Sequence, residues 1–206
     1  MSMITMKKPT FYFERQYIDR GFKVIAGVDE AGAGTLAGPV VASAVVLPLD
    51  SRLGDLNDSK LLSRNKREEL YEKILIKADF WSIGEASHEE VDQINVRQAS
   101  LLAMRRALEK IEGLEVALID AWNIPGIECE QESIIKGDQL VKSIAAASII
   151  AKVTRDRFMV SMSEVYPEYG FEKHKGYGTK MHFSQIEKFG PCPIHRISYK
   201  VFDKYR

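Results

Sequence analysis

Residues 24–34 read VIAGVDEAGAG, an apolar run that ends at two adjacent carboxylates, Asp29 and Glu30, and continues into a Gly-X-Gly turn. A short apolar run bounded by glycine is typical of a buried strand, and it is too short to cross a membrane. Ionised carboxylates at the end of a buried strand lose hydration and therefore need partners. Divalent cations would best offset that cost, so the stretch predicts a metal site.

Other interpretations of this region stand beside the metal site. The two carboxylates could end the strand in solvent, where most acidic residues lie. Residues 32–37, GAGTLA, also fit the dinucleotide-binding pattern G-x-G-x-x-A, which needs a helix N-terminus to hold the pyrophosphate. Instead, Gly-Pro and the apolar run VVASAVVL at residues 40–47 come next, and they predict a second strand and a hairpin. A P-loop is excluded because no Gly-Lys-Ser/Thr closes the turn.

The alternation of side chains along a strand sets a condition on the two carboxylates. Neighbouring residues of a regular strand point to opposite faces of the sheet, so Asp29 and Glu30 do not both face one site directly. Either the strand has ended by Glu30, or one of the two contributes differently, through a longer reach or a backbone carbonyl.

Composition places the chain among ordinary globular proteins. Its 206 residues, 45% of them hydrophobic, suffice for one large domain or for one domain with a small helical appendage. Lys+Arg and Asp+Glu number 29 each, so no overall field attracts nucleic acid or an anionic membrane, and such binding requires local patches. The two cysteines form no zinc-type spacing. Residues 1–10 lack the apolar core of a secretory signal, which indicates a cytoplasmic protein.

Further along the chain, apolar strands end at acids. We expect helices over residues 11–22, 66–76 and 141–166 and from the capping sequence at Ser87 to Gly113, and strands over 80–86, 116–120 and 133–135. The strand at 116–120 ends at Asp120, and the strand at 133–135 continues into Lys-Gly-Asp138. Strand ends at one edge of an open sheet form a common crevice. Asp29, Glu30, Asp120 and Asp138 are therefore expected to converge there.

Two later segments carry weaker signals. The helix at 141–166 has a face of small residues, Ala145, Ala146, Ala147, Ser148 and Ala151, which favours close packing on the sheet. Residues 173–180, KHKGYGTK, form a basic segment in which Tyr177 stands between two glycines. Flanking glycines leave an aromatic ring approachable, as a stacking platform requires, although the same residues also suit a solvated loop.

These motifs, taken in order, resemble bacterial ribonuclease H type 2 (ribonuclease HII) over nearly the whole chain. The matching segments are GVDEAG (27–32), LAGPVV (36–41), DSK (58–60), ID (119–120), KGD (136–138), SIAAASIIAKVTRD (143–156), HKGY (174–177) and HR (195–196). The resemblance implies an α/β protein of the ribonuclease H-like fold, with a five-stranded mixed sheet flanked by helices and a helical C-terminal portion. We expect one catalytic domain over 1–206, with about 160–206 as a substrate-binding extension.

The resemblance also implies a function. Such enzymes cleave the RNA strand of RNA/DNA hybrids, and cleave at single ribonucleotides embedded in duplex DNA, as endonucleases that leave 5′-phosphate and 3′-hydroxyl ends. The family's four metal-binding carboxylates fall on Asp29, Glu30, Asp120 and Asp138, the set that the strand ends select. An all-oxygen ligand set suits Mg²⁺ or Mn²⁺ in a two-metal site. We further expect a monomer without a membrane partner, and the C-terminus shows no evident sliding-clamp peptide.

By the same resemblance, particular residues recognise the substrate. The backbone of Gly32, Ala33 and Gly34 and the side chain of Tyr177 sense the ribose 2′-hydroxyl at the ribonucleotide–deoxyribonucleotide junction, because that group separates RNA from DNA locally. Lys60 and Arg155 are expected phosphate contacts, and the Ser148 hydroxyl is a weaker one. The family usually has Arg between the two glycines, and this chain has Ala33 instead. The substitution removes a guanidinium able to clamp a phosphate.

Two other classes of function remain as alternatives. A catalytically silent hybrid-binding protein would be consistent with the altered residue 33, but the four retained carboxylates argue against it. A nicotinamide-dependent oxidoreductase would require a helix over residues 38–47 in place of the predicted strand.

Overall fold

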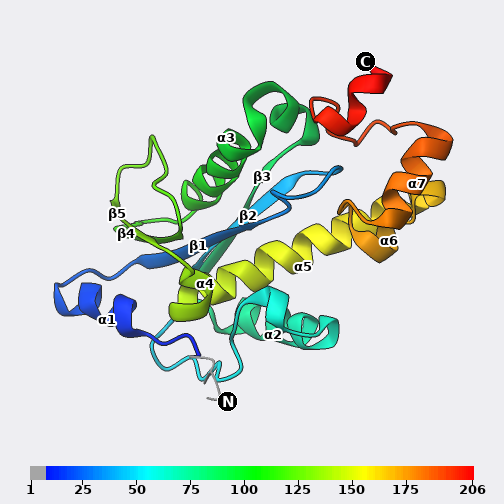
Figure 1. The fold of residues 1–206 in the computed structure, drawn as a ribbon. Helices are drawn as coiled ribbons and strands as arrows, with labels where there is room; N and C mark the ends of the chain where they lie inside the picture. The colour runs from blue at the N-terminus through cyan, green and yellow to red at the C-terminus, as the bar shows by residue number, and fades with distance from the viewer. Residues whose placement is uncertain (1–7) are drawn as a thin grey trace, which may run out of the picture.

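The computed structural model describes residues 8–206, and the absence of a signal sequence was inferred partly from residues 1–7, outside this range. Its centre is a five-stranded sheet in the order β3-β2-β1-β4-β5. β1 (Ile25–Ala31), β2 (Val40–Val46) and β3 (Phe80–Ala86) pair antiparallel, and β4 (Val116–Asp120) and β5 (Glu130–Ile134) join β1 in parallel. Figure 1 shows helices on both faces. The predicted mixed α/β sheet is confirmed.

The first two strands form the expected hairpin. β1 pairs with β2 from Gly27 opposite Val45 to Ala31 opposite Val41. Residues 40–46 are therefore strand, and the helix that a dinucleotide site would need over residues 38–47 is not formed. This finding removes the oxidoreductase alternative.

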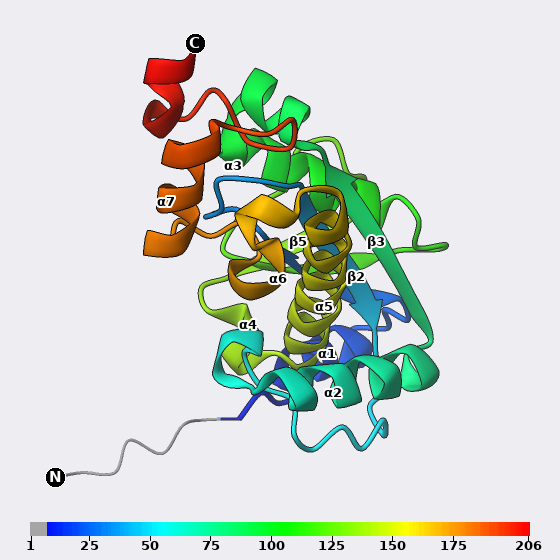
Figure 2. The ribbon, with the colours of Figure 1, turned by 90° about the vertical axis from the view of Figure 1, so that its right-hand side faces the viewer.

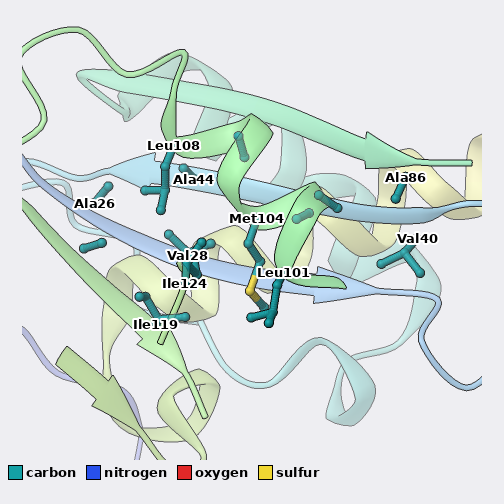
Figure 3. Packing of buried hydrophobic residues seen from close by; sticks show 14 of the residues in the cluster. Ala26, Val28, Val40, Ala44, Ala86, Leu101, Met104, Leu108, Ile119 and Ile124 are labelled. Carbon is teal, nitrogen blue, oxygen red and sulfur yellow. The ribbon is translucent and has the colours of Figure 1, made fainter. Parts of the chain in front are cut away.

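One face of the sheet is covered by α3 (His88–Leu108), as Figures 1 and 3 show. Val28 of β1 and Ala44 of β2 pack under Met104 of the helix in a continuous apolar cluster. The capping box at Ser87 is present. The helix ends at Leu108, five residues before the expected stop at Gly113, because residues 109–112 form turns rather than α-helix.

The other face is covered by α5 (Lys142–Val165), flanked by α1 (Tyr12–Asp19) and α2 (Arg64–Lys77) on the same side of the sheet (Figures 1 and 2). Close approach depends on Gly27, because a Cβ there would lie 2.2 Å from the Ser143 carbonyl carbon. Ala145, Ala146 and Ala147 are fully buried under this face. The small-residue face thus serves close helix–sheet packing, as predicted.

The predicted strand over residues 133–135, which was to lead into Asp138, has the wrong bounds. β5 covers residues 130–134, with the polar sequence EQESI, and stops before Ile135, which is 78% exposed. Asp138 is therefore not at a strand end: it lies in the first turn of the short helix α4 (Gly137–Leu140). Lys136, in the left-handed backbone region at φ 58°, turns the chain between the two elements. An edge strand with one open side tolerates polar residues that an apolar pattern does not reveal.

The C-terminal elements build a small core of their own. η2 (Pro167–Tyr169), α6 (Phe171–His174), α7 (Lys180–Phe189) and η3 (Lys200–Tyr205) gather at the end of the molecule away from α1 (Figure 1). Phe171 and Phe202 are fully buried there and share a cluster with Ala37 of the β1–β2 loop. The C-terminal portion is thereby fixed against that loop. Among the helices of residues 8–206, none is both long and apolar enough to pass through a membrane.

Candidate active site

The two neighbouring carboxylates lie where β1 extends past β4. Strand pairing between β1 and β4 stops at Val28 opposite Ile119, whereas β1 itself continues to Ala31. Asp29 falls on the α5 face and is only 5% exposed, and Glu30 falls on the α3 face. Because β1 continues to Ala31, the strand has not ended by Glu30. The other expected alternative, a different contribution through a longer reach or a backbone carbonyl, therefore stays a prediction for Glu30.

The other two carboxylates come from the neighbouring strand and the short helix. Asp120 is the last residue of β4, and its Oδ1 accepts a hydrogen bond from the Gly137 amide at 2.8 Å. A Cβ on Gly137 would lie 2.6 Å from Ile144 Cδ1, so the glycine allows the chain to pass close to α5 without displacing that side chain. Asp138 follows directly and is 5% exposed. The Lys-Gly-Asp segment thus delivers Asp138 to the end of β4.

The pKa shifts of these acids indicate that they lie near one another. Burial raises the pKa of Asp29 well above its ordinary value, and the charges of Glu30 and Asp120 raise it further. The pKa of Glu30 is raised by burial and then by Asp120. Burial and the nearby carboxylates bring the pKa of Asp138 to about 6. Like charges shift one another in this way only at close range, so Glu30, Asp120 and Asp138 all lie near Asp29.

A fifth acid, Asp58, belongs to the same cluster and was not assigned from the sequence. It is 5% exposed, and its charge is the second cause, after burial, of the raised Asp138 pKa. Its Oδ1 accepts the Lys60 amide at 2.8 Å and caps η1 (Ser59–Leu61). The available signal was a carboxylate two residues before a lysine, which by itself predicts only a helix cap.

Lys60 lies at the rim of this cluster. Burial alone would lower the pKa of its ammonium, but the charges of Asp29, Asp58, Asp138 and Glu30 act in the other direction, and the net pKa is raised. Lys60 is thus a cation directly beside the carboxylates. Ser148, by contrast, is 3% exposed and donates its hydroxyl hydrogen to Ser59 Oγ at 2.8 Å. Its position beneath η1 is not that of a phosphate contact; it supports the element that carries Lys60.

The glycine loop after β1 is held by two buried arginines. The Arg155 side chain is completely buried and donates to the carbonyl oxygens of Pro39, Lys175 and Ala37 and to Thr35 Oγ1. Arg196, also completely buried, donates to the carbonyl oxygens of Gly32, Ala33, Thr35 and Gly38. The expected phosphate contact from Arg155 is therefore not what the structure shows. The sequence identified Arg196 only as part of the HR motif at 195–196, and its role in holding the loop was not predicted.

These hydrogen bonds orient the loop for recognition. Its carbonyl oxygens point inward to the guanidinium groups, and within residues 8–206 the amides of Ala33 and Gly34 have no hydrogen-bond acceptor. Gly32, at φ 99°, has no space for a side chain, since a Cβ would lie 2.1 Å from Arg155 Nε. Gly34 has open space around its Cα. The loop therefore leaves these two amides free to donate, three and four residues beyond Glu30 in the chain.

Tyr177 stands beside this loop. Its ring is 38% exposed, with Lys152 Nζ 5.1 Å from the ring centre, and its backbone forms a bridge with Thr35. A chain of buried imidazoles fixes its backbone. His182 Nδ1 donates to the Tyr177 carbonyl at 3.0 Å, and the Nε2 atoms of His182 and His195 share a hydrogen bond at 3.0 Å. At the other end of the chain, His195 Nδ1 accepts from the Cys192 amide at 2.9 Å. The predicted approachable ring is present.

The donor set fits hard divalent cations. All the clustered groups are carboxylate oxygens, and their mutually raised pKa values show excess negative charge that a cation would relieve. Within residues 8–206, no three acidic, histidine or cysteine side chains converge closely enough to enclose one ion.

Comparison with known proteins identifies the family. Residues 26–202 match the family model of ribonuclease HII. The chain belongs to the ribonuclease HII family. It is 50% identical over 188 residues to the ribonuclease HII of Clostridioides difficile, across 91% of this chain and 74% of that protein. Ribonuclease HII enzymes are endoribonucleases that cleave the RNA of RNA/DNA hybrids and ribonucleotides within DNA, and the chain has this activity.

Solved structures agree with the fold. The crystal structure of ribonuclease H2 from Pyrococcus horikoshii superposes with a TM-score of 0.74 at 25% identity, covering 87% of this chain and 95% of that one. Ribonuclease HII from Archaeoglobus fulgidus, solved in a complex with PCNA, gives a TM-score of 0.71 at 27% identity, over 86% and 96% of the two chains. The expected ribonuclease H-like fold is thus confirmed. The inference that no clamp peptide is present gains no support, because this relative was solved with PCNA.

Proposed function

We propose that Asp29, Glu30, Asp120 and Asp138 form the metal-binding centre at which this ribonuclease HII hydrolyses its substrate. The observation that carries the proposal is that all four side chains, from two strands and a short helix, lie close enough to raise the pKa of one another or of shared neighbours. A catalytically silent binding protein would have no need to keep this mutual repulsion, which costs stability without a bound cation.

Mg²⁺ or Mn²⁺ suits this set of oxygen ligands. When bound, two such ions would supply an activated water and would neutralise charge on the attacking and leaving oxygens. Asp29 and Asp120 would hold ions on the α5 side of the strand edge, and Glu30 would reach the same edge from the α3 side. The products expected from this chemistry are a 5′-phosphate and a 3′-hydroxyl.

The glycine loop and Tyr177 are the proposed reader of the ribonucleotide. The outward amides of Ala33 and Gly34 are free to donate to an acceptor, and the ribose 2′-hydroxyl is the acceptor that distinguishes RNA from DNA. The Tyr177 ring, next to the loop and exposed, provides a surface for the following deoxyribose. Arg155 and Arg196 act through the loop by fixing its carbonyl oxygens, and are positioning residues.

Cations beside the centre would hold the duplex backbone. Lys60 lies at the carboxylates. Lys152, Lys175 and Arg64 form a second group of cations. Burial lowers the pKa of Lys175, and the nearby charges of Arg64 and Lys152 lower it further. The Lys152 ammonium also contacts the Tyr177 ring. Phosphate contacts of this kind position a duplex without reading its sequence. They supply the local basic patch that a chain of zero net charge needs.

The remaining expectations are proposals about the whole chain. The separate apolar cluster of the C-terminal elements, joined to the β1–β2 loop through Ala37, supports residues 160–206 as a substrate-binding extension of a single catalytic domain. We further propose a monomer located in the cytoplasm. Light scattering during gel filtration tests the first point, since a dimeric mass would contradict it.

A cleavage assay tests the proposed centre. The substrate is a DNA duplex with one ribonucleotide, incubated with Mg²⁺ or Mn²⁺, and an all-DNA duplex of the same sequence is the control. We expect a single cut at the ribonucleotide, with a 3′-hydroxyl end that a DNA polymerase extends. Cleavage that persists at the parental rate with EDTA in place of the metal would overturn the metal centre.

A further inference from the structure

The Trp122 and Arg97 side chains form an exposed pair that the proposed centre does not use. Trp122 is 46% exposed although indole is among the side chains best stabilised by burial. The Arg97 guanidinium lies over it, 4.3 Å from Cζ to the ring centre. Arg97 forms no ion pair with another residue of the described range 8–206, so its charge is available to an outside partner.

Residues with an unusual backbone conformation precede both members of the pair in the chain. The Trp122 amide donates to the Asp120 carbonyl at 3.0 Å across Ala121, whose φ is 67°. This is a three-residue turn of the strained, left-handed kind, and strain of this type persists at functional sites when the surroundings enforce it. Asn95, at φ 67°, interrupts α3, and its side-chain Oδ1 accepts the Arg97 and Gln98 amides. Arg97 therefore starts a newly capped helical segment.

The turn places the pair next to the catalytic strand end. One residue, Ala121, separates Trp122 from Asp120, so their Cα atoms are at most about 7 Å apart, and the amide–carbonyl hydrogen bond folds Trp122 back onto the strand end. Arg97 belongs to α3, which covers the sheet face onto which Glu30 projects. The pair thus flanks the carboxylates on the α3 side, whereas Lys60 belongs to η1, which contacts α5 on the other side.

We propose that the Arg97–Trp122 pair binds the sugar–phosphate backbone of the substrate duplex at nucleotides flanking the scissile phosphate. The inference rests on the proposed carboxylate centre, because it takes the scissile phosphate to lie at Asp120. The occupant is identified by chemistry: a free guanidinium matches a phosphate, and an exposed aromatic face packs on a sugar or base. The pair and Lys60 then hold the duplex from the two sides of the centre.

Tryptophan fluorescence tests this contact directly, since the chain contains only two tryptophans. The substitution Trp81→Phe leaves Trp122 as the single reporter, and Trp122→Phe leaves Trp81, which is 42% exposed on the edge strand β3 and serves as the matched control. Each protein is titrated in EDTA with a DNA duplex that contains one ribonucleotide, while the anisotropy of a labelled duplex reports binding. We expect the emission of Trp122 to change with saturation and that of Trp81 to stay constant.

Substitutions measure the contribution of each member. Trp122→Ala is expected to weaken duplex binding about 5- to 150-fold, the range for one aromatic stacking contact. Arg97→Gln is expected to flatten the dependence of log affinity on log salt by about 0.9, as for one phosphate contact. Arg105→Gln, two turns further along α3 and paired with Glu109, makes the same change of charge away from the centre and should leave the slope unaltered.

The outcomes separate this inference from the proposed function. If the parental chain cleaves the duplex and binds it, but Trp122 emission stays constant at saturation and both substitutions bind normally, the pair is no part of the substrate surface. If the parental chain does not bind or cleave ribonucleotide-containing DNA, the proposed function itself fails. Circular dichroism of each variant shows whether a loss of binding comes instead from misfolding.

Discussion

Arg155 of α5 and Arg196 of the C-terminal segment both donate to the loop that joins β1 to β2: Arg155 Nη2 lies 2.9 Å from the Ala37 carbonyl oxygen, and Arg196 Nη2 lies 2.9 Å from that of Gly38. Both guanidinium groups are completely buried. Burial lowers the pKa of Arg155 to about 10, and the charge of Arg196 contributes to the shift. Two like charges are kept in the interior because they satisfy the carbonyl oxygens of a loop that cannot pair as a strand.

The first prediction follows from this arrangement. Arg155→Met keeps the aliphatic stem but leaves the carbonyl oxygens of Pro39 and Lys175 without donors and removes one of the two donors to the Ala37 carbonyl. Each unsatisfied buried group costs about 1–3 kcal/mol, so we expect the free energy of unfolding in urea to fall by about 3 kcal/mol or more.

Arg157→Met is the matched control on the same helix. Its exposed side chain bridges Glu68 and Glu72, and surface ion pairs contribute about 0–1 kcal/mol. Equal losses of stability in the two variants would show that the buried hydrogen bonds do not hold the loop.

The second prediction concerns the carboxylate cluster. Asp138→Asn should abolish turnover with Mg²⁺, because it removes one of the four proposed metal ligands. Without metal, the same variant should be more stable than the parental chain at pH 7.5, because the pKa of Asp138 is raised to about 6 and its ionised form is disfavoured in the fold. We expect a gain of about 1–2 kcal/mol in EDTA, after allowing for solvent screening.

Asp79→Asn, an exposed acid just before β3, is the control for charge removal. It should change neither turnover nor stability measurably. Parental turnover in Asp138→Asn would show that Asp138 is no ligand, and a loss of stability in EDTA would show that the cluster is not self-repelling.

The distribution of these residues shows why sequence reasoning succeeded at some of them. Asp29 and Asp120 follow apolar runs, and parallel pairing of β1 with β4 places such strand ends together, so pattern alone selects them. Asp58 and Arg196 follow no apolar run. Their roles depend on contacts with residues about 80 and 160 positions away in the chain, at Asp138 and Gly38, which only folding creates.

The third prediction is that folding stability falls in acid because of the imidazole chain behind Tyr177. Burial lowers the pKa of His182 and of His195 to about 4, from an ordinary value of 6.5. Between pH 6.5 and 4 the unfolded chain therefore binds more protons than the folded one, and stability falls as pH decreases through this window. By pH 5.5 the expected loss is about 1 kcal/mol for each ring. The raised pKa of Asp138 acts in the opposite direction.

The variant His182→Gln tests this effect, since it removes one of the buried imidazoles whose pKa is lowered. Urea unfolding at pH 7.5, 6.5 and 5.5 should show a flatter decline in stability for the variant, whatever its stability at pH 7.5. The same slope in both proteins would mean that the ring is not held neutral in the fold.

The fourth prediction concerns substrate choice. Tyr177→Ala removes the exposed ring beside the glycine loop, and we expect a loss of about 1–3 kcal/mol in kcat/KM on duplexes with a ribonucleotide–deoxyribonucleotide junction. The loss on uniform RNA/DNA hybrids should be smaller. Tyr12→Ala, 61% exposed on α1, is the control. An equal loss on both substrates would remove Tyr177 from junction recognition.

The fifth prediction concerns Ala33, where the chain differs from the pattern usual in its family. Ala33 adopts no positive φ and is only partly buried, so the backbone conformation does not oppose an arginine at this position. If the usual guanidinium holds a phosphate, Ala33→Arg adds one charge-assisted contact, which contributes about 1.5–3 kcal/mol. The contact exists in the bound substrate and in the transition state alike, so the gain should lower KM and leave kcat nearly constant.

Salt dependence decides whether the contact is new. One additional neutralised phosphate should steepen the fall of log affinity with log salt by about 0.9, and Ala33→Met, which adds length without charge, should leave the slope unaltered. The alternative is that Lys60 or Lys175 already occupies the phosphate. The Lys60 ammonium lies beside the carboxylates, and the Lys175 ammonium donates to the Glu172 carbonyl. Neither ammonium therefore binds the loop. We therefore expect the arginine to bind, and an unchanged KM and slope would mean that the contact has been rebuilt by another cation.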